Sequence, residues 1–123
     1  MGLTRCRFYV LGEPGTPYPA AIRALRRRSG VYIIRDRATR EVLYVGESHS
    51  ARLYATMTRH FQSWADPHGS HGRPHLWHHA YPRNTVEVAF RAVPAPNACA
   101  WEEWYIARLQ PRDNNRAVQL APF

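Results

Sequence analysis

Hydrophobic and polar residues recur along the chain in short blocks that turn residues separate. Two early runs rich in apolar β-branched residues predict strands, and a later run of the same kind predicts a third. In two other segments the apolar residues recur at helical spacing, which predicts amphipathic helices. The expected core elements are strands over 31–34, 42–45 and 85–93 and helices over 51–64 and 98–109, the last with Asn97 as its N-cap.

The order strand, strand, helix, strand, helix predicts an α+β fold. The first two strands are too close for a parallel crossover, so we expect a small antiparallel sheet with a three-stranded core, flanked by helices. Before this core, the proline-rich stretch 12–19 separates a candidate strand at 7–11 from a short helix at about 20–28. The expected division is an N-terminal extension that packs on the core, a main domain and a C-terminal tail, over residues 1–29, 30–115 and 116–123.

The first two strands predict a hairpin. Centring its turn on Ala38 gives these cross-strand pairs: Gly30 with Gly46, Tyr32 with Tyr44, and Ile34 with Val42. Both tyrosines then share one face, and the opposite face holds an aliphatic set suited to a core, namely Val31, Ile33, Leu43 and Val45. The pattern alone favours an ordinary cross-strand aromatic pair. A glycine beside each tyrosine, however, indicates that a ligand or another backbone comes close there.

The helix predicted over 51–64 has an apolar face and a basic face. Its expected core residues are Leu53, Tyr54, Met57, Phe61 and Trp64. Arg52 and Arg59 lie about 20° apart on the opposite face, and His60 lies at the boundary between the two. A solvated polar face is one interpretation. Because the helix contains no acidic partner for either arginine, a phosphate-facing surface fits better.

The last predicted helix carries two adjacent glutamates with different environments. Glu102 falls inside the apolar arc, whereas Glu103 points about 100° away and is expected to be exposed. A partly buried carboxylate needs a cation or hydrogen-bond donors to offset its desolvation. Two interpretations stay open for Glu102: an ion pair with an arginine, or a divalent metal, of which Mg²⁺ fits a site with few carboxylates best.

Charge is the feature of the composition that changes this picture. The chain has 123 residues, and its 17 basic residues, all arginine, stand against nine acidic ones for a net charge of +8. This balance predicts a polyanionic partner. The absence of lysine fits either phosphate recognition by arginine or a general preference for arginine codons.

Cysteine usage and hydropathy exclude several protein classes. Cys6 and Cys99 form no CxxC pair, which excludes a disulfide scaffold and a thiolate zinc finger, and we expect both to be small buried residues. No apolar run approaches a membrane span, and the N-terminus lacks the hydrophobic region of a signal peptide. We therefore expect a soluble, cytoplasmic protein with no membrane partner.

A run of histidines lies between the predicted long helix and the third strand: His68, His71, His75, His78 and His79. Spacings of three and four residues would allow these imidazoles to bind zinc. Solvated loop histidines, or histidines that touch a substrate backbone, are the stronger interpretation because no cysteine or acidic cluster accompanies them. Trp77 and Tyr81 lie in the same stretch and are expected to pack rather than to stack on a base.

The motifs of the two hairpin strands and of the last helix resemble those of the GIY-YIG nuclease superfamily. The matching residues are Gly30-Val31-Tyr32, Tyr44-Val45-Gly46, the arginine-bearing helix, Glu102 and Asn114. In segment 102–114 a Glu is followed by an Ile, by Gln-Pro-Arg and by an Asn, as in the family member of the bacterial excision-repair nuclease. The resemblance covers about residues 29 to 115 and depends on the order and spacing of the motifs, since each tripeptide alone is weak.

The resemblance implies a metal-dependent DNA endonuclease that hydrolyses phosphodiester bonds at a single-metal site, with Mg²⁺, or Mn²⁺ in its place, as cofactor. Tyr32 and Tyr44 would line the scissile phosphate, and Tyr32 is favoured as the base while Tyr44 stays open. Neighbouring positive charge would have to stabilise the phenolate near neutral pH. The other implied roles are charge stabilisation for Arg52, a position near the phosphate for His60, metal ligation for Glu102, fixing of the site for Asn114, and substrate binding for Gly30, Gly46 and Arg59.

Departures from the family pattern keep alternatives open. Arg52 follows Gly46 sooner than usual and precedes His60 by more than one helical turn, so Arg59 is an alternative catalytic arginine. Asp113 stands where many members have an aromatic residue, which would allow a second carboxylate near the metal. A catalytically inactive nucleic-acid-binding module of the same fold is the alternative function, since +8 suffices for binding. We expect DNA as partner of a monomer or transient homodimer, with a protein partner as a further source of specificity.

Overall fold

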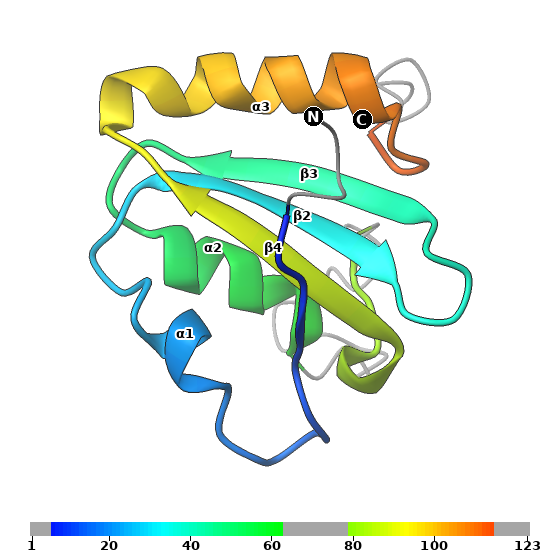
Figure 1. Cartoon of the computed structure of the whole chain (residues 1–123). Coiled ribbons are helices and arrows are strands. Elements are labelled where there is room, and N and C mark those ends of the chain that lie inside the picture. Colours follow the sequence, from blue (N-terminus) through cyan, green and yellow to red (C-terminus); the bar gives the residue numbers. More distant parts are fainter. Residues whose placement is uncertain (1–5, 63–78, 115–123) are drawn as a thin grey trace, which may run out of the picture.

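The computed structural model describes residues 6–62 and 79–114 (Figure 1). Its antiparallel sheet has four strands in the order β1-β4-β2-β3. The strands are β1 (Tyr9–Val10), β2 (Gly30–Asp36), β3 (Val42–Ser48) and β4 (Val86–Ala92). The helices are α1 (Ala20–Arg23), α2 (Leu53–Thr58) and α3 (Ala95–Leu109), with 3₁₀ turns η2 (Arg59–Phe61) and η4 (Arg83–Thr85).

These elements confirm the α+β prediction and an antiparallel sheet around β2, β3 and β4. The sheet has one strand more than the expected three-stranded core because the two-residue β1 pairs with β4. None of the helices in the described ranges is long and apolar enough to cross a membrane.

Helices cover both faces of the sheet: α3 lies on one side, and α1 and α2 lie on the other (Figure 1). Strand β2 lies between β4 and β3, so its side chains are buried on both faces, which explains its continuous apolar run. On the α2 side the main buried residues are Leu11, Ile22, Leu25, Tyr32, Ile34, Leu43, Leu53, Met57, Phe61, Val86 and Val88. On the α3 side they are Val31, Ile33, Val45, Ala89 and Tyr105.

The register of the β2–β3 hairpin differs from the prediction by two residues. Tyr32 pairs with Gly46, and Ile34 pairs with Tyr44. The turn is set by the carboxylate of Asp36, whose Oδ1 accepts hydrogen bonds from the N–H groups of Ala38 and Thr39, both 2.8 Å long. Because a shift of two preserves the alternation of side chains, Tyr32 still shares a face with Tyr44 as predicted.

Leu43 is on the face opposite to the one predicted. The register changes between Ile34, which pairs with Tyr44, and Arg35, which pairs with Val42. Leu43 is therefore the extra residue of a bulge, which places it and Tyr44 together on the α2 side. The predicted set of Val31, Ile33, Leu43 and Val45 loses this one member.

Both long helices differ in extent from their predictions. The predicted helix 51–64 is a six-residue α2 followed by the turn η2, and Trp64 lies outside the described residues. Helix α3 begins at Ala95 with Pro94 as N-cap, so the prediction of Asn97 as N-cap was wrong. A proline has no backbone N–H group, but the N–H groups of the first helical turn have no partner within the helix in any case. Prolines at this point therefore do not delay the start of the helix.

The N-terminal segment shares the core on the α2 side. Ile22 and Leu25 are buried there. Arg83 is also buried and donates hydrogen bonds to the carbonyl oxygens of Leu11 and Thr16, with its guanidinium 4.1 Å from the centre of the Tyr18 ring. The Arg83 guanidinium is therefore engaged by backbone carbonyls of the N-terminal segment.

Candidate active site around Tyr32 and His60

Tyr32 and His60 form a buried hydrogen-bonded pair on the α2 side of the sheet. The Tyr32 hydroxyl oxygen lies 2.7 Å from Nε2 of His60, and the two residues are 2% and 9% exposed. Nδ1 of His60 bonds to the carbonyl oxygen of His79, which only accepts, so Nδ1 carries the hydrogen. Nε2 is therefore the acceptor, and the Tyr32 hydroxyl donates to it. The neutral imidazole is oriented to take the phenol proton.

The environment keeps both groups neutral at rest. Burial raises the pKa of Tyr32 well above its ordinary value, and the neighbouring Tyr44 adds to this, while the Arg59 charge opposes it. Burial also lowers the pKa of His60 to about 4, with a smaller contribution from the Arg59 charge. Neither a free phenolate nor a free imidazolium is favoured, so both side chains rest neutral, and a proton transfer between them needs a further charge that stabilises the products.

Gly46 makes room for the Tyr32 ring. A Cβ atom at this position would collide with the hydroxyl and ring atoms of Tyr32, and a Cβ at Gly30 would collide with the carbonyl oxygen of Arg91. The prediction that another backbone or a ligand approaches each glycine is confirmed at Gly30, where the neighbour is a backbone, whereas at Gly46 the neighbour is the Tyr32 ring. Both glycines are buried against protein atoms, so they permit close packing, and the substrate-binding role that the resemblance implied for them stays a prediction.

Tyr44 lies beside the pair and is half-buried. Its ring centre is 6.2 Å from that of Tyr32 and 5.0 Å from that of His60, and it stacks on His79 at 4.5 Å. The resemblance implied that both phenols line the same phosphate. In the structure, both phenol rings lie beside the His60 imidazole. Tyr44 is the more accessible phenol, whereas Tyr32 has the hydrogen-bonded base.

Tyr81 and Asp113 close the cluster on another side. The Tyr81 hydroxyl donates to Oδ2 of Asp113 over 2.6 Å, and Arg112 donates to both oxygens of the same carboxylate. Tyr81 is buried in the core, as the packing interpretation predicted. The Asp113 carboxylate thus has protein donors on each oxygen, and its use as a second metal ligand stays a prediction.

Arg52 and Arg59 share a face of the helical segment, as predicted. Both are exposed, and with Ala55, Thr56 and Gln62 they line a shallow surface pocket of ≈ 220 Å³. Arg52 begins the segment, where its N–H donates to Ser48 Oγ at the end of β3 over 3.0 Å. Arg59 lies at its other end, and its charge acts on both Tyr32 and His60. Of the two arginines, Arg59 has the closer electrostatic link to the pair.

Glu102 and Glu103 have the environments predicted for them: Glu102 is half-buried on α3 and Glu103 is exposed. The negative charge of Glu102 contributes to the raised pKa of Tyr32, so this carboxylate acts on Tyr32 although α3 covers the other face of the sheet. Metal ligation by Glu102 stays a prediction.

Asn114 fixes the segment after α3 to the sheet. Its side-chain amide accepts a hydrogen bond from the N–H of Val45 over 2.8 Å and donates one to the Val45 carbonyl over 3.0 Å. The N–H groups of Arg112 and Asp113 bond to the carbonyls of Val42 and Leu43. Residues 112–114 therefore cover the open edge of β3 as a further strand would, directly beside Tyr44.

The predicted histidine run is only partly described. His68, His71, His75, His78 and Trp77 lie outside the described residues. His79 is described, and it holds His60 through its carbonyl oxygen and stacks on Tyr44. This backbone contact could not be predicted, because the spacing of residues in a sequence indicates which way side chains point but not which way carbonyl groups point.

Sequence reasoning missed a second group of side chains. Glu47, His49 and Cys99 bring ligand atoms within 4.8 Å of one another at the end of β3 and the first half of α3. Cys99 is exposed and Cys6 is half-buried, which corrects the expectation that both are buried. Glu47 lies on the α3 side because it pairs with Val31, but nothing in the sequence indicates that Cys99 meets it there.

Comparison of the chain with models of protein families, with curated proteins and with solved structures finds no match.

Proposed function

We propose that the protein is a metal-dependent endonuclease that hydrolyses phosphodiester bonds in DNA. The observation that carries the proposal is the Tyr32–His60 hydrogen bond, in which the imidazole nitrogen facing the phenol is an acceptor. Proton transfer through a phenol needs such a base, because the hydroxyl alone releases its proton only near pH 10. The net charge of +8 supports a polyanionic substrate.

In the proposed reaction, Tyr32 takes a proton from the attacking water while its own proton passes to Nε2 of His60. Coupling of the two transfers avoids a free phenolate, which burial disfavours, and the negative charge that grows on the attacked phosphate stabilises the His60 imidazolium that forms. The Arg59 guanidinium stabilises the negative charge that develops on the phenol oxygen during the transfer. General-base catalysis of this kind contributes about 10²-fold to 10⁴-fold in rate.

The basic pocket supplies the phosphate contacts. Arg52 and Arg59 both line it, and guanidinium groups bind phosphate oxygens through paired hydrogen bonds. Their charge also favours the transition state, in which negative charge on the phosphate grows. Because the pocket is shallow and open, it admits a polymer backbone more easily than a small ligand that must be enclosed.

Glu102 is the residue of this chain that would hold the metal. A half-buried carboxylate suits Mg²⁺, which prefers oxygen ligands, keeps several waters and uses one or two carboxylates. When bound, the ion would polarise the phosphate and stabilise the leaving oxygen. Mn²⁺ takes the same class of ligand.

The test is cleavage of supercoiled plasmid in Mg²⁺, with and without EDTA. Tyr32→Phe and Glu102→Gln should each lower the nicking rate at least about 10²-fold while DNA binding by gel shift is retained. The matched controls are Tyr105→Phe, a buried tyrosine on the opposite face, and Glu103→Gln, the adjacent exposed carboxylate, and both should cut like the parent.

Three outcomes would contradict the proposal or a part of it. Equal nicking by Glu102→Gln and the parent would remove the metal assignment, and equal nicking by Tyr32→Phe would remove the proton relay. A parent protein that binds plasmid but leaves it supercoiled in Mg²⁺ and in Mn²⁺ would instead be the catalytically inactive nucleic-acid-binding module, which the charge of +8 also supports.

A further inference from the structure

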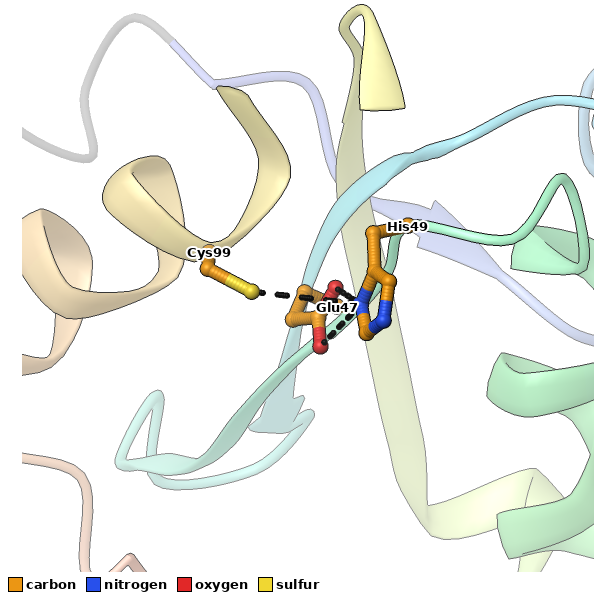
Figure 2. Close-up of side chains that lie close together, drawn as sticks. All are labelled: Glu47, His49 and Cys99. Atoms are coloured by element: carbon orange, nitrogen blue, oxygen red, sulfur yellow. Dashed lines mark hydrogen bonds and ion pairs between the residues drawn. The ribbon is translucent and has the colours of Figure 1, made fainter. Parts of the chain in front are cut away.

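Glu47, His49 and Cys99 converge at the side of the molecule where β3 ends beside α3 (Figure 2). Nδ1 of His49 lies 3.0 Å and 3.2 Å from the two carboxylate oxygens of Glu47 and 3.9 Å from Sγ of Cys99. Three different ligand types therefore face one another across two elements that are far apart in the sequence.

The fold places these side chains without strain in the sheet. Glu47 pairs with Val31, which belongs to the core on the α3 side, so the Glu47 side chain leaves the sheet toward α3. Cys99 follows Ala98, the buried residue that packs the first half of α3 against the sheet. His49 comes directly after β3, and its side chain is 63% exposed. The group is open to solvent on one side and supported by rigid elements on the other.

The spacing of the ligand atoms suits a tetrahedral zinc ion. With Zn–S near 2.3 Å and Zn–N or Zn–O near 2.0 Å, tetrahedral angles put nitrogen and oxygen ligands about 3.3 Å apart and sulfur and nitrogen about 3.5 Å apart. The observed separations of 3.0 Å and 3.9 Å are close to these values. All three ligand atoms lie within 4.8 Å of one another, so the remaining adjustment concerns side chains.

The ligand chemistry separates this group from the proposed magnesium site. A thiolate, an imidazole and a carboxylate suit a borderline-soft dication such as Zn²⁺, whereas Mg²⁺ prefers oxygen ligands alone. Thiolate and carboxylate together also carry two negative charges, which match the charge of the ion.

The surrounding charges favour a cation at this point of a basic protein. The carboxylates of Glu47, Glu102 and Glu103 all act on the Cys99 thiol, so the local charge around it is negative. With a dication bound, the same carboxylates would stabilise the complex through their charge. An ordinary His49–Glu47 ion pair would not need a thiol and two further carboxylates.

We propose that Glu47, His49 and Cys99 bind one Zn²⁺ ion, with water in the fourth position. The ion would tie the end of β3 to the first half of α3, one helical turn before Glu102. The proposal does not depend on nuclease activity, because it concerns metal binding by different residues.

Titration of the full-length protein with Co²⁺ tests the proposal, since Co²⁺ replaces Zn²⁺ and reports its ligands by absorption. The parent should bind one equivalent with a thiolate-to-cobalt charge-transfer band and the visible bands of tetrahedral cobalt. Zn²⁺ should abolish these bands, and excess Mg²⁺ should not. Cys99→Ser should lose the charge-transfer band, and His49→Ala should bind at least about 100-fold more weakly, because even partners outside the ligand shell change affinity 10-fold to 100-fold.

Two control variants make the test specific. Cys6→Ser removes the other cysteine and Glu41→Gln removes an exposed carboxylate at the opposite end of β3, and both should keep the band at parental strength. Circular dichroism checks that each variant folds. The proposal is overturned if the parent gives no thiolate band, if the band survives in Cys99→Ser, or if cobalt binds through imidazoles alone.

Discussion

Acidification should destabilise the protein through His60. Above about pH 6.5 this imidazole is neutral in the folded and the unfolded chain, so it adds no pH dependence. As the pH falls from 6.5 toward about 4, the unfolded chain binds a proton at His60 while the folded chain does not. The free energy of unfolding therefore decreases across this window, and the decrease is complete below the folded-state pKa.

The size of this effect follows from the two pKa values. The full gap between 6.5 and about 4 corresponds to about 3 kcal/mol at roughly 1.4 kcal/mol per pH unit. Between about pH 7.5 and about pH 5, the same linkage relation gives a loss of about 2 kcal/mol. His60 is 9% exposed, so solvent screening does not reduce this figure much. Such a loss is a large part of the stability of a small domain.

Urea unfolding of the parent and of His60→Gln at these two pH values measures the effect. The neutral glutamine variant is expected to be less stable at the higher pH, but its free energy of unfolding should fall by about 2 kcal/mol less than that of the parent. Carboxyl groups such as Asp113 titrate in both proteins, so their contribution cancels in the comparison. An equal decrease in both proteins would refute the assignment of a neutral buried His60.

Three further variants test the packing around the site. Gly46→Ala should destabilise the fold by about 1–3 kcal/mol by forcing the Tyr32 ring to move, and thermal unfolding measures this; unchanged stability would contradict the close packing. Asn114→Ala should destabilise it by about 1–3 kcal/mol and speed hydrogen exchange at the Val45 N–H, since the side-chain acceptor is lost; an unchanged exchange rate would show that the edge is held by other contacts. Arg83→Met should leave carbonyls of the N-terminal segment without their donor, so limited proteolysis should cut that segment faster than in the parent.

The sequence alone predicted the features that depend on local periodicity. Alternation along the strands and the recurrence of apolar residues along the helices assigned faces correctly for Tyr32, Tyr44 and Val45. The same reasoning placed Glu102 partly inside and Glu103 outside. These predictions hold because the pitch of a helix and the pleat of a strand are properties of the backbone itself.

Element boundaries and cross-strand register needed the folded structure. The Asp36 side chain sets the hairpin turn, and the bulge at Leu43 changes its face, so a centre counted from the apolar runs misplaces the pairs. Prolines do not delay the start of α3, because the first turn of a helix has N–H groups without partners in any case.

Tertiary structure also decided which polar groups meet. Tyr32 and His60 are 28 residues apart, and their contact depends on how α2 and η2 pack against β2. The charge state of His60 depends on its burial and on a carbonyl of His79, and neither is encoded at the position itself. In the same way, Glu47 and Cys99 meet only because α3 crosses the end of β3. Periodicity fixes the face on which a side chain lies, but packing of distant segments fixes its partner, because contact and desolvation are properties of the assembled chain.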